Sequence, residues 1–377
     1  MELCPLDNRY KKETTNVREI FSTFGYTRHR VFIELAYFIE LARFLKIVDI
    51  KDQHYISKHC KNIYKDYADH FKISDFEKIQ SYEKVTNHDV KAIEYYVKDL
   101  LENRFTQYKF YKEYVHFGLT SQDINNTAFS LMNTNCIENI IIPTARSLCN
   151  DISNLSTKWM DIVMISKTHG QPAVPTTLGK ELAVFVERIQ TELIVLEHTE
   201  VTTKFGGAVG NMNAHYCAFP DKNWLDFASD FVESFNLQRQ TYTTQIDHYD
   251  SLARVFDSIA RLNVIFKDFC VDMWLYISMN YLSQKIVATE TGSSTMPHKV
   301  NPINFENAEG NIGIANSLFN HFSSKLPQSR LQRDLTDSTV IRNVGMAFGY
   351  TMVAMNSISK GIQKITPNIF VIKAELD

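Results

Sequence analysis

The side chains best suited to chemistry gather in residues 291–307, which read TGSSTMPHKVNPINFEN. Serines, asparagines, a histidine and a lysine surround two prolines there, with almost no apolar bulk. Gly292 permits backbone conformations that other residues resist, and the prolines stiffen the chain, so we predict a shaped loop that presents polar groups. Asn304, just after Pro302, is predicted to cap a following helix. The positive N-terminal end of that helix, beside the charge of Lys299, would suit the binding of an anion. A solvated loop with incidental polar residues is the alternative.

A histidine in a second polar segment could transfer protons. His169 lies in SKTHGQPAVPTT, residues 166–177, between two predicted helices and directly before a glycine. A side chain at such a break can meet a ligand and exchange a proton with it near neutral pH. A loop histidine that is merely solvated is the competing interpretation.

Two further polar segments fit helix starts. HFGLTSQDINN, residues 116–126, offers Thr120 or Ser121 as a cap, with Asp123 in the first turn. TNHDVKA, residues 86–92, has the same character. Its candidate cap residues are Asn87, His88 and Asp89. Capping alone would explain both segments, so neither defines a function by itself.

Three arginines stand among hydroxyl side chains in SRLQRDLTDSTVIRN, residues 329–343. Arginine binds phosphate or carboxylate through two parallel hydrogen bonds, so all three are candidate anion ligands. They are Arg330, Arg333 and Arg342. The alternative is a solvated charged turn in which Asp334 and Asp337 serve as local partners.

Two other segments favour structural roles. KFGGAVGNMNAH, residues 204–215, is rich in glycine but matches neither common nucleotide-loop pattern, so a tight link between antiparallel helices is predicted. DHYD, residues 247–250, contains possible metal ligands, but the sequence lacks HExxH, paired cysteines and a carboxylate loop pattern. Helix capping is therefore predicted at DHYD, and no metal site.

Long helices must position these segments, because only 13 glycines and 9 prolines interrupt the chain. Between Pro175 and Gly206 apolar residues recur every three or four positions, which predicts one helix of about seven turns. A similar stripe predicts a helix over 251–281, and further helices are predicted over 137–163 and 304–322. We therefore predict an all-α bundle of long helices, whose additional apolar faces are buried against other subunits. The first stripe consists of Leu178, Leu182, Phe185, Ile189, Leu193 and Leu196.

Residues 1–110 differ from the rest, with shorter periodic stretches and many lysines and tyrosines. They are predicted to form a small N-terminal helical domain, followed by the central bundle over 111–364. Turns of the small domain are expected near Gly25, Asp52 and Asn87. Strand signals are scarce.

Composition fits an ordinary globular protein. Apolar residues make up 44% of the 377-residue chain and charged residues 22%, and the net charge of -3 gives no pull toward nucleic acid or membrane. No apolar run approaches the roughly 20 residues of a membrane span. The six cysteines form no CxxC pair, and the N-terminus lacks an apolar leader. A cytoplasmic protein with reduced thiols is predicted, without nucleic-acid or membrane partners.

Eight segments occur in the order found in the fumarase/aspartase superfamily of lyases, which the chain resembles over nearly its whole length. They are PLDNRY at 5–10, TNHDVKA, HFGLTS, THGQP, GAVGN, TQID, GSSTMPHKVNP and SKLPQSRLQRDLTDSTVIRN. The pattern GSSxMPxKxNP is shared by the whole superfamily. Thr295 and His298 within it, together with LQRDLTDST, resemble the adenylosuccinate lyases of the longer bacterial and protozoan type.

The resemblance implies a β-elimination that splits adenylosuccinate into AMP and fumarate. It also implies the same cleavage of the succinyl carboxamide ribonucleotide SAICAR to AICAR, in purine biosynthesis. By analogy with the family, Ser293 is expected to be the base and His169 the general acid. Lys299 and Asn301 are expected to stabilise the doubly charged aci-carboxylate that proton removal creates. Neither a metal nor an organic cofactor is expected.

The resemblance implies a small C-terminal helical domain after the bundle, so residues 365–377 are expected to be the start of such a domain, truncated here. It further implies a homotetramer with active sites shared between chains, and it assigns the substrate-binding residues. The succinyl and purine portions are expected to contact Thr120, Ser121, Gln245, Ser294 and Asn307. The phosphate and carboxylates are expected to contact Arg9, Tyr10, Arg333, Ser338 and Arg342. Asn87, His88, Asp89 and Lys299 are also expected at the substrate. His88 and His116 match family histidines that support the site, and their separate roles are left open.

Two rival interpretations remain at the level of the sequence. A non-enzymatic structural protein could keep the lyase fold, and loss of His169 or Ser293 would favour it, but both residues are present. A lyase for a different succinyl-amine is the rival among enzymes. The arginine-rich segment 329–343, which suits a phosphate, argues against that substrate.

Overall fold

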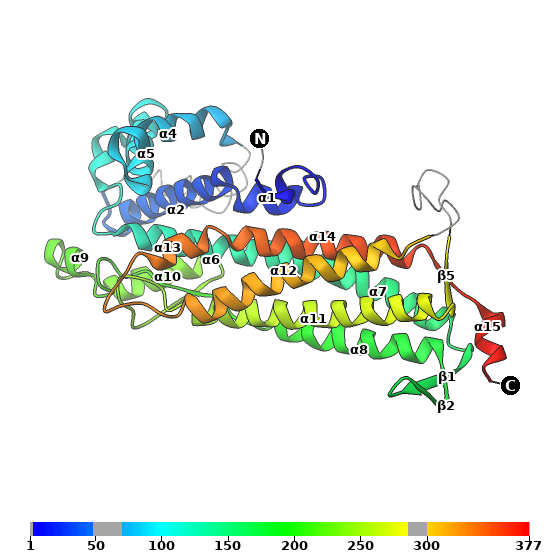
Figure 1. Ribbon diagram of the computed structural model, residues 1–377. Helices are drawn as coiled ribbons and strands as arrows, with labels where there is room; N and C mark the ends of the chain where they lie inside the picture. Colours follow the sequence, from blue (N-terminus) through cyan, green and yellow to red (C-terminus); the bar gives the residue numbers. More distant parts are fainter. Residues whose placement is uncertain (1–2, 48–69, 286–299, 377) are drawn as a thin grey trace.

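The computed structural model describes residues 3–47, 70–285 and 300–376, and most of them are helical. Five long helices lie side by side and give the molecule its elongated shape (Figure 1). They are α7 (Ile142–Lys158), α8 (Leu178–Glu197), α11 (Asp250–Ser278), α12 (Ile303–Lys325) and α14 (Val344–Ile362). Helix α12 packs against both α11 and α14, and α7 packs against α8. The predicted all-α bundle of long helices is confirmed.

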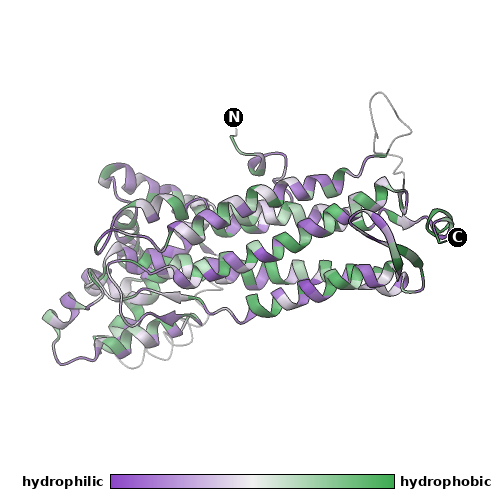
Figure 2. Cartoon of the chain, turned by 60° about the horizontal axis from the view of Figure 1, so that its bottom comes forward, coloured by the Kyte–Doolittle hydropathy of each residue, from purple (hydrophilic) through white to green (hydrophobic). Residues whose placement is uncertain are grey.

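Apolar periodicity accounts for the bundle core. All six predicted positions of α8 are buried, and they join a core cluster with residues of α7, α11, α12 and α14. Apolar and polar residues alternate in blocks along these helices, as expected when one face is buried (Figure 2). The predicted seven-turn helix is too long, however, because α8 ends at Glu197. The chain then becomes extended and forms β3 (Thr202–Thr203), which pairs in parallel with β4 (Gln238–Arg239).

The segment around His169 is a β-hairpin, which sequence analysis did not predict. Strand β1 (Val163–Thr168) pairs antiparallel with β2 (Gln171–Thr177). His169 and Gly170 form the two-residue turn with φ angles of 54° and 72°, and a type I′ hairpin turn requires positive φ at both positions. Two prolines in β2 concealed the strand, because proline is confined to edges and bulges of sheets.

The described residues before 115 form helices beside one end of the bundle (Figure 1). Their elements are η1 (Pro5–Asp7), α1 (Thr15–Phe21), α2 (Thr23–Phe44), α4 (Ile73–Thr86), α5 (Asp89–Asn103) and η2 (Thr106–Tyr114). The turns predicted near Gly25 and Asn87 are confirmed, since α2 starts after a break at Ser22 and Asn87 ends α4 in a left-handed conformation. The turn predicted at Asp52 lies outside the described residues.

A second core cluster combines α2 and α5 with α6 (Ser121–Cys136) and α10 (Trp224–Glu233). Apolar packing is therefore continuous across the predicted boundary at residue 110, and the division into domains stays a prediction. The remaining elements are η3 (Ile137–Ile141), α9 (Asn213–Ala218), β5 (Leu282–Gln284), α13 (Thr336–Ile341), β6 (Ile365–Pro367) and α15 (Ile369–Ala374).

The two ends of the bundle differ. Helices α9, α10 and α13 lie at one end, whereas the β1–β2 hairpin, β5 and α15 lie at the other (Figure 1). Within the described ranges, no helix combines the length and the apolar character that a membrane crossing needs.

Candidate active site

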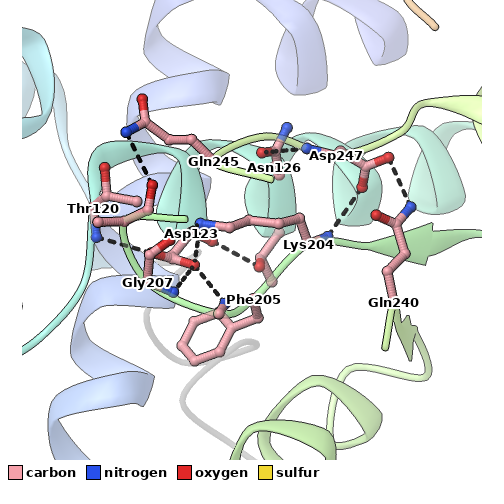
Figure 3. Close-up of polar contacts among 12 residues, drawn as sticks. Thr120, Asp123, Asn126, Lys204, Phe205, Gly207, Gln240, Gln245 and Asp247 are labelled. Carbon is pink, nitrogen blue, oxygen red and sulfur yellow. Dashed lines mark hydrogen bonds and ion pairs between the residues drawn. The ribbon is translucent and has the colours of Figure 1, made fainter. Parts of the chain in front are cut away.

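A buried ion pair lies at the start of α6. The side chains of Asp123 and Lys204 are fully buried, and 2.7 Å separates Oδ1 from Nζ. Asp123 also accepts hydrogen bonds from the backbone N–H groups of Thr120, Gly206 and Gly207 (Figure 3). Burial lowers the pKa of Lys204, and the charge of Asp123 only partly offsets that effect. One carboxylate thus fastens the glycine-rich segment to the cap of α6.

The glycine-rich segment is therefore more than a connection. The prediction of a tight link between two antiparallel helices is wrong, because residues 204–215 join β3 to the short helix α9 and are held by Asp123. Gly210 has a φ of 83°, and a Cβ atom there would lie only 2.3 Å from the carbonyl oxygen of Thr243. Only glycine permits that close approach.

Asp247 extends the buried network. Its carboxylate accepts hydrogen bonds from the backbone N–H of Lys204 at 3.0 Å and from the side-chain amide of Gln240 at 2.9 Å (Figure 3). Burial raises the pKa of Asp247 to about 6. DHYD was predicted to cap a helix. Tyr249 occupies the N-cap position of α11, but its side chain accepts no hydrogen bond from the first turn of that helix. Asp247 instead holds two backbone amides, those of Lys204 and Tyr249.

Several side chains expected to bind substrate gather beside this network. Arg333 donates hydrogen bonds to Oε1 of Gln245 at 3.2 Å and to Oγ of Ser338 at 3.4 Å. Gln245 donates in turn to the carbonyl of Ala208 at 3.0 Å, so the segment held by Asp123 also orients Gln245. Gln122 of α6 donates to Ser338 at 3.4 Å. A guanidinium, an amide and a hydroxyl thus converge in a group suited to an anion.

Thr120 and Ser121 stand at the first turn of α6, next to this group. Thr120 and Asp123 form a capping box, which agrees with the capping interpretation of their segment. Both Thr120 and Ser121 are half-buried. Arg330, by contrast, pairs with Asp334 at 3.1 Å, so this arginine has the local partner that the alternative interpretation expected.

Asp89 connects the N-terminal helices with the arginine segment. Its Oδ2 atom accepts hydrogen bonds from Arg30 at 2.7 Å and from Arg342 at 3.2 Å. Burial by itself would raise the pKa of Asp89, but the charges of Arg30 and Arg342 outweigh burial and lower it to about 2. Asn87, two residues before Asp89, is exposed and ends α4 in a left-handed conformation with a φ of 49°.

The two supporting histidines have different surroundings. His88 caps α5, because its Nδ1 accepts the backbone N–H of Lys91 at 3.1 Å, and half of its side chain is exposed. His116 is nearly buried, with Nδ1 2.9 Å from Glu34 and Nε2 3.8 Å from Glu94. Burial lowers the pKa of His116, but these carboxylates more than offset burial and the pKa is raised. The two carboxylates therefore favour the protonated form of this imidazole.

Tyr10 and Asn307 form a separate polar contact on the first turns of α12. The Nδ2 group of Asn307 donates to the Tyr10 hydroxyl at 2.9 Å, and the Arg9 guanidinium lies 5.8 Å from the Tyr10 ring centre. Burial raises the pKa of Tyr10, but hydrogen bonds from Asn307, Arg9 and Asn311 outweigh burial and lower it. The Tyr10 hydroxyl therefore loses its proton more readily than that of an ordinary tyrosine.

The start of α12 differs from the prediction. Pro302 is the residue before the helix, and Asn304 lies inside it, so the prediction that Asn304 caps α12 is wrong. Its side-chain oxygen instead accepts a hydrogen bond from Lys364 at 3.3 Å. Asn301 is half-buried just before this helix. The predicted residues Ser293, Ser294 and Lys299 lie outside the described residues.

His169 is far from the Arg333 group within one chain. It is exposed at the tip of the β1–β2 hairpin, at the end of the bundle opposite α13 (Figure 1). Helix α11 runs along this length, and its 29 residues at 1.5 Å each span about 43 Å. The chain therefore brings Gln245, Arg333 and Ser338 together, but it does not bring His169 to them.

Three charged residues that hold candidate site residues in place were not predicted from the sequence. Lys204 lies in a glycine-rich segment, and no local pattern marks its burial. Arg30 and Glu34 lie one turn apart in a stretch that is otherwise mostly buried and apolar. Charges at such spacing inside an apolar helix were the available signal.

The arrangement of long helices is shared with solved structures. A fumarate lyase from a Mesorhizobium species matches 96% of this chain and 78% of its own, with a TM-score of 0.75 and 17% identity. The 3-carboxy-cis,cis-muconate lactonizing enzyme from Pseudomonas putida matches the same shares, with a TM-score of 0.74 and 19% identity. These similarities establish the fold of the fumarase/aspartase superfamily.

Sequence comparison identifies the family within that class. Residues 8–315 match the family model described as lyase, and residues 329–377 match the one described as adenylosuccinate lyase C-terminal. Curated adenylosuccinate lyases from Dictyostelium discoideum and Escherichia coli are 45% and 42% identical over all of this chain, which spans 81% of each. The chain belongs to the adenylosuccinate lyase family, and it is a carbon–nitrogen lyase.

Removing the buried lysine should destabilise the fold. We expect Lys204→Met to lower the free energy of unfolding by about 3–5 kcal/mol, because Asp123 would remain buried without its cation. Chemical denaturation of both proteins measures the difference. Lys158→Met, at an exposed position of α7, is the matched control and should change stability by less than about 0.5 kcal/mol. Equal stability of the two variants would show that the pair is dispensable.

Proposed function

We propose that this lyase eliminates fumarate from adenylosuccinate to leave AMP, and that it cleaves SAICAR to AICAR in purine biosynthesis. The observation that carries the proposal is 42% to 45% identity with curated adenylosuccinate lyases along the whole chain. The group formed by Arg333, Gln245 and Ser338 supports it, since these side chains suit a phosphate or carboxylate.

The elimination removes a proton from the carbon next to a succinyl carboxylate and breaks the bond between the neighbouring carbon and the amino nitrogen. The electrons of the former C–H bond form the double bond of fumarate, and those of the C–N bond pass to nitrogen, which takes up a proton. We propose Ser293 as the base and His169 as the acid. Proton removal concentrates negative charge on the carboxylate, and Lys299 and Asn301 are proposed to stabilise it.

The substrate-binding residues are proposed in three groups. Arg333, Ser338 and Arg342, with Arg9 and Tyr10, would surround the phosphate and carboxylates. Thr120, Ser121, Gln245, Ser294 and Asn307 would surround the succinyl and purine portions. Asn87, His88, Asp89 and His116 would complete the N-terminal side. The lowered pKa of Tyr10 and the pairing of Arg342 with Asp89 support polar roles for these side chains.

We also propose a homotetramer in which each active site draws on more than one chain. The distance between His169 and the Arg333 group supports this assembly, because a second chain must supply one of them. Exposed apolar side chains on the long helices support it further, since an apolar helix face is stable when covered. Ile194, Trp274 and Ile314 are 57%, 41% and 48% exposed in one chain.

A cytoplasmic location is part of the same proposal. Five cysteines fall in the described ranges, and each of them is a free thiol. Free thiols are characteristic of a reducing compartment.

The purified protein should convert adenylosuccinate to equal amounts of AMP and fumarate without added metal, because protein groups suffice to stabilise the charge. An absorbance assay with chromatographic identification of fumarate measures the reaction, and a chelator should leave its rate unchanged. Inactivation by chelator with rescue by a divalent ion would contradict the cofactor-free mechanism. Faster cleavage of argininosuccinate would contradict the proposed substrate.

Single substitutions test the proton-transfer groups. His169→Ala and Ser293→Ala should each lower kcat by roughly 10²–10⁴-fold with the melting temperature preserved, because each removes a proton carrier and little packing. Steady-state kinetics and thermal denaturation together measure both quantities. A serine variant that turns over normally would place the base elsewhere.

Mixing the two inactive variants tests the shared site. Co-refolded His169→Ala and Ser293→Ala chains should regain about a quarter of wild-type activity, because random assembly leaves that share of sites with both groups intact. Differently tagged chains that copurify verify mixing. Mixed tetramers that stay as inactive as either variant would show that both groups come from one chain.

A further inference from the structure

Helix α2 buries two opposite charges on one face. Arg30 is 3% exposed and Glu34 is 0% exposed, and their spacing of four residues places them one turn apart. Each buried ion costs several kcal/mol in desolvation, and a well-packed apolar pair is often at least as stable. Stability alone therefore gives a weak reason for charges at these two positions.

Each of the two side chains contacts one residue of the candidate active site. The Arg30 guanidinium lies 4.1 Å from the centre of the Tyr26 ring and donates to Asp89 at 2.7 Å. Stacking and hydrogen bonding together leave the Arg30 side chain little conformational freedom. Arg30 therefore fixes the carboxylate of Asp89, which also accepts a hydrogen bond from Arg342. Glu34 approaches Nδ1 of His116 at 2.9 Å.

The backbone at His116 shows that this histidine is held in place. Its φ of 61° is left-handed, which is uncommon for a residue with a side chain. Such conformations cluster at functional sites, where the surrounding structure enforces them. The Nε2 atom of His116 lies 3.8 Å from Glu94, beyond hydrogen-bonding distance, so this N–H group can still serve a ligand.

The hydrogen bonds of the two α2 side chains are incomplete. The Nε atom of Arg30 and the Oε1 atom of Glu34 are buried and have no hydrogen-bond partner among the described residues. A pair selected for stability alone would be expected to satisfy every polar atom. The arrangement instead favours one strong contact from each side chain to a site residue.

We propose that Arg30 and Glu34 are positioning residues of the active site: Arg30 fixes Asp89, and Glu34 holds His116 oriented and protonated. The inference rests on the proposed function, because it gives roles to residues expected at the substrate. His116 then contributes a fixed positive charge and a directed N–H donor toward the anionic substrate.

The charges around His116 determine how it responds to pH. Glu34 faces it from α2, Glu94 from α5 and Asp123 from α6, and Lys91 binds the other oxygen of Glu94. The raised pKa of His116 means that the imidazolium persists to higher pH in the folded protein. Neutralising Glu34 removes the nearest carboxylate, so the imidazole should lose its proton at a lower pH.

Glu34→Gln tests this role, because it keeps the shape and removes the charge. With adenylosuccinate, kcat/KM should fall about tenfold or more at pH 8 and recover to within about threefold of wild type at pH 6, since an adjacent opposite charge shifts a pKa by 1–3 units. Arg30→Lys should raise KM by about fivefold or more with kcat nearly unchanged. Lysine keeps the positive charge but lacks the planar guanidinium that stacks on Tyr26 and hydrogen-bonds to Asp89.

Matched controls lie on the same helix. Glu40 and Arg43 form an ion pair on α2 at 3.3 Å, with half of the Arg43 side chain exposed. Glu40→Gln and Arg43→Lys should leave kcat, KM and the pH profile unchanged. An equal loss of activity at pH 6 and pH 8 in Glu34→Gln, together with a lower melting temperature, would reduce Glu34 to a structural role and overturn the proposal.

A measurement without substrate separates this inference from the proposed function. Histidine labelled with ¹³C at the ring Cε1 reports protonation of His116 by NMR, with His116→Asn providing the assignment. The titration midpoint should fall by about one pH unit or more in Glu34→Gln. An unchanged midpoint would overturn the inference, whereas failure of the wild type to cleave adenylosuccinate would overturn only the proposed substrate.

Discussion

Lys204 and Asp123 form a fully buried ion pair between the N-cap of α6 and the glycine-rich segment. Two ions removed from water are retained only when other hydrogen bonds compensate them. Backbone amides supply that compensation to Asp123, and the carbonyl of Gly207 supplies it to Lys204. Because these partners belong to the main chain, the pair fixes backbone as well as side chains. Gln245 hydrogen-bonds to the same segment, and Arg333 to Gln245, so the geometry of the anion-binding group follows from the pair.

The length of the bundle imposes a second constraint. Helices such as α11 bury one face along nearly their whole length, so core packing runs through the bundle from end to end. Helix α13, which carries Ser338 of the Arg333 group, lies at one end, and the β1–β2 hairpin with His169 lies at the other (Figure 1). A single chain cannot fold back to join them without breaking the core. The proposed site, which needs both sets of residues, would have to draw on more than one chain, and the exposed apolar side chains of α8, α11 and α12 offer surface for the proposed assembly.

The periodicity of apolar residues predicted the long helices, whose buried faces follow from the local sequence. The stripe of α8 and the extent of α11 were visible in the sequence because apolar residues recur every three or four positions on the buried face of each helix. The end of α8 was not visible, because the extended chain after it is selected by tertiary hydrogen bonds, including that from Lys204 to Asp247. The His169 hairpin was hidden for a related reason, since its strands pair with each other and contain prolines.

Motif resemblance predicted candidate site residues, but it could not show how they are held. Thr120 could be recognised as a cap, whereas Lys204 lies 81 positions after Asp123 in the sequence, so the burial of this pair leaves no local pattern. The same holds for Arg30 and Asp89, which lie 59 residues apart. The residues expected to touch substrate thus sit at helix starts and turns, where short motifs form. The charges that hold them are buried in the protein interior, where the low dielectric strengthens each contact and makes a missing partner costly.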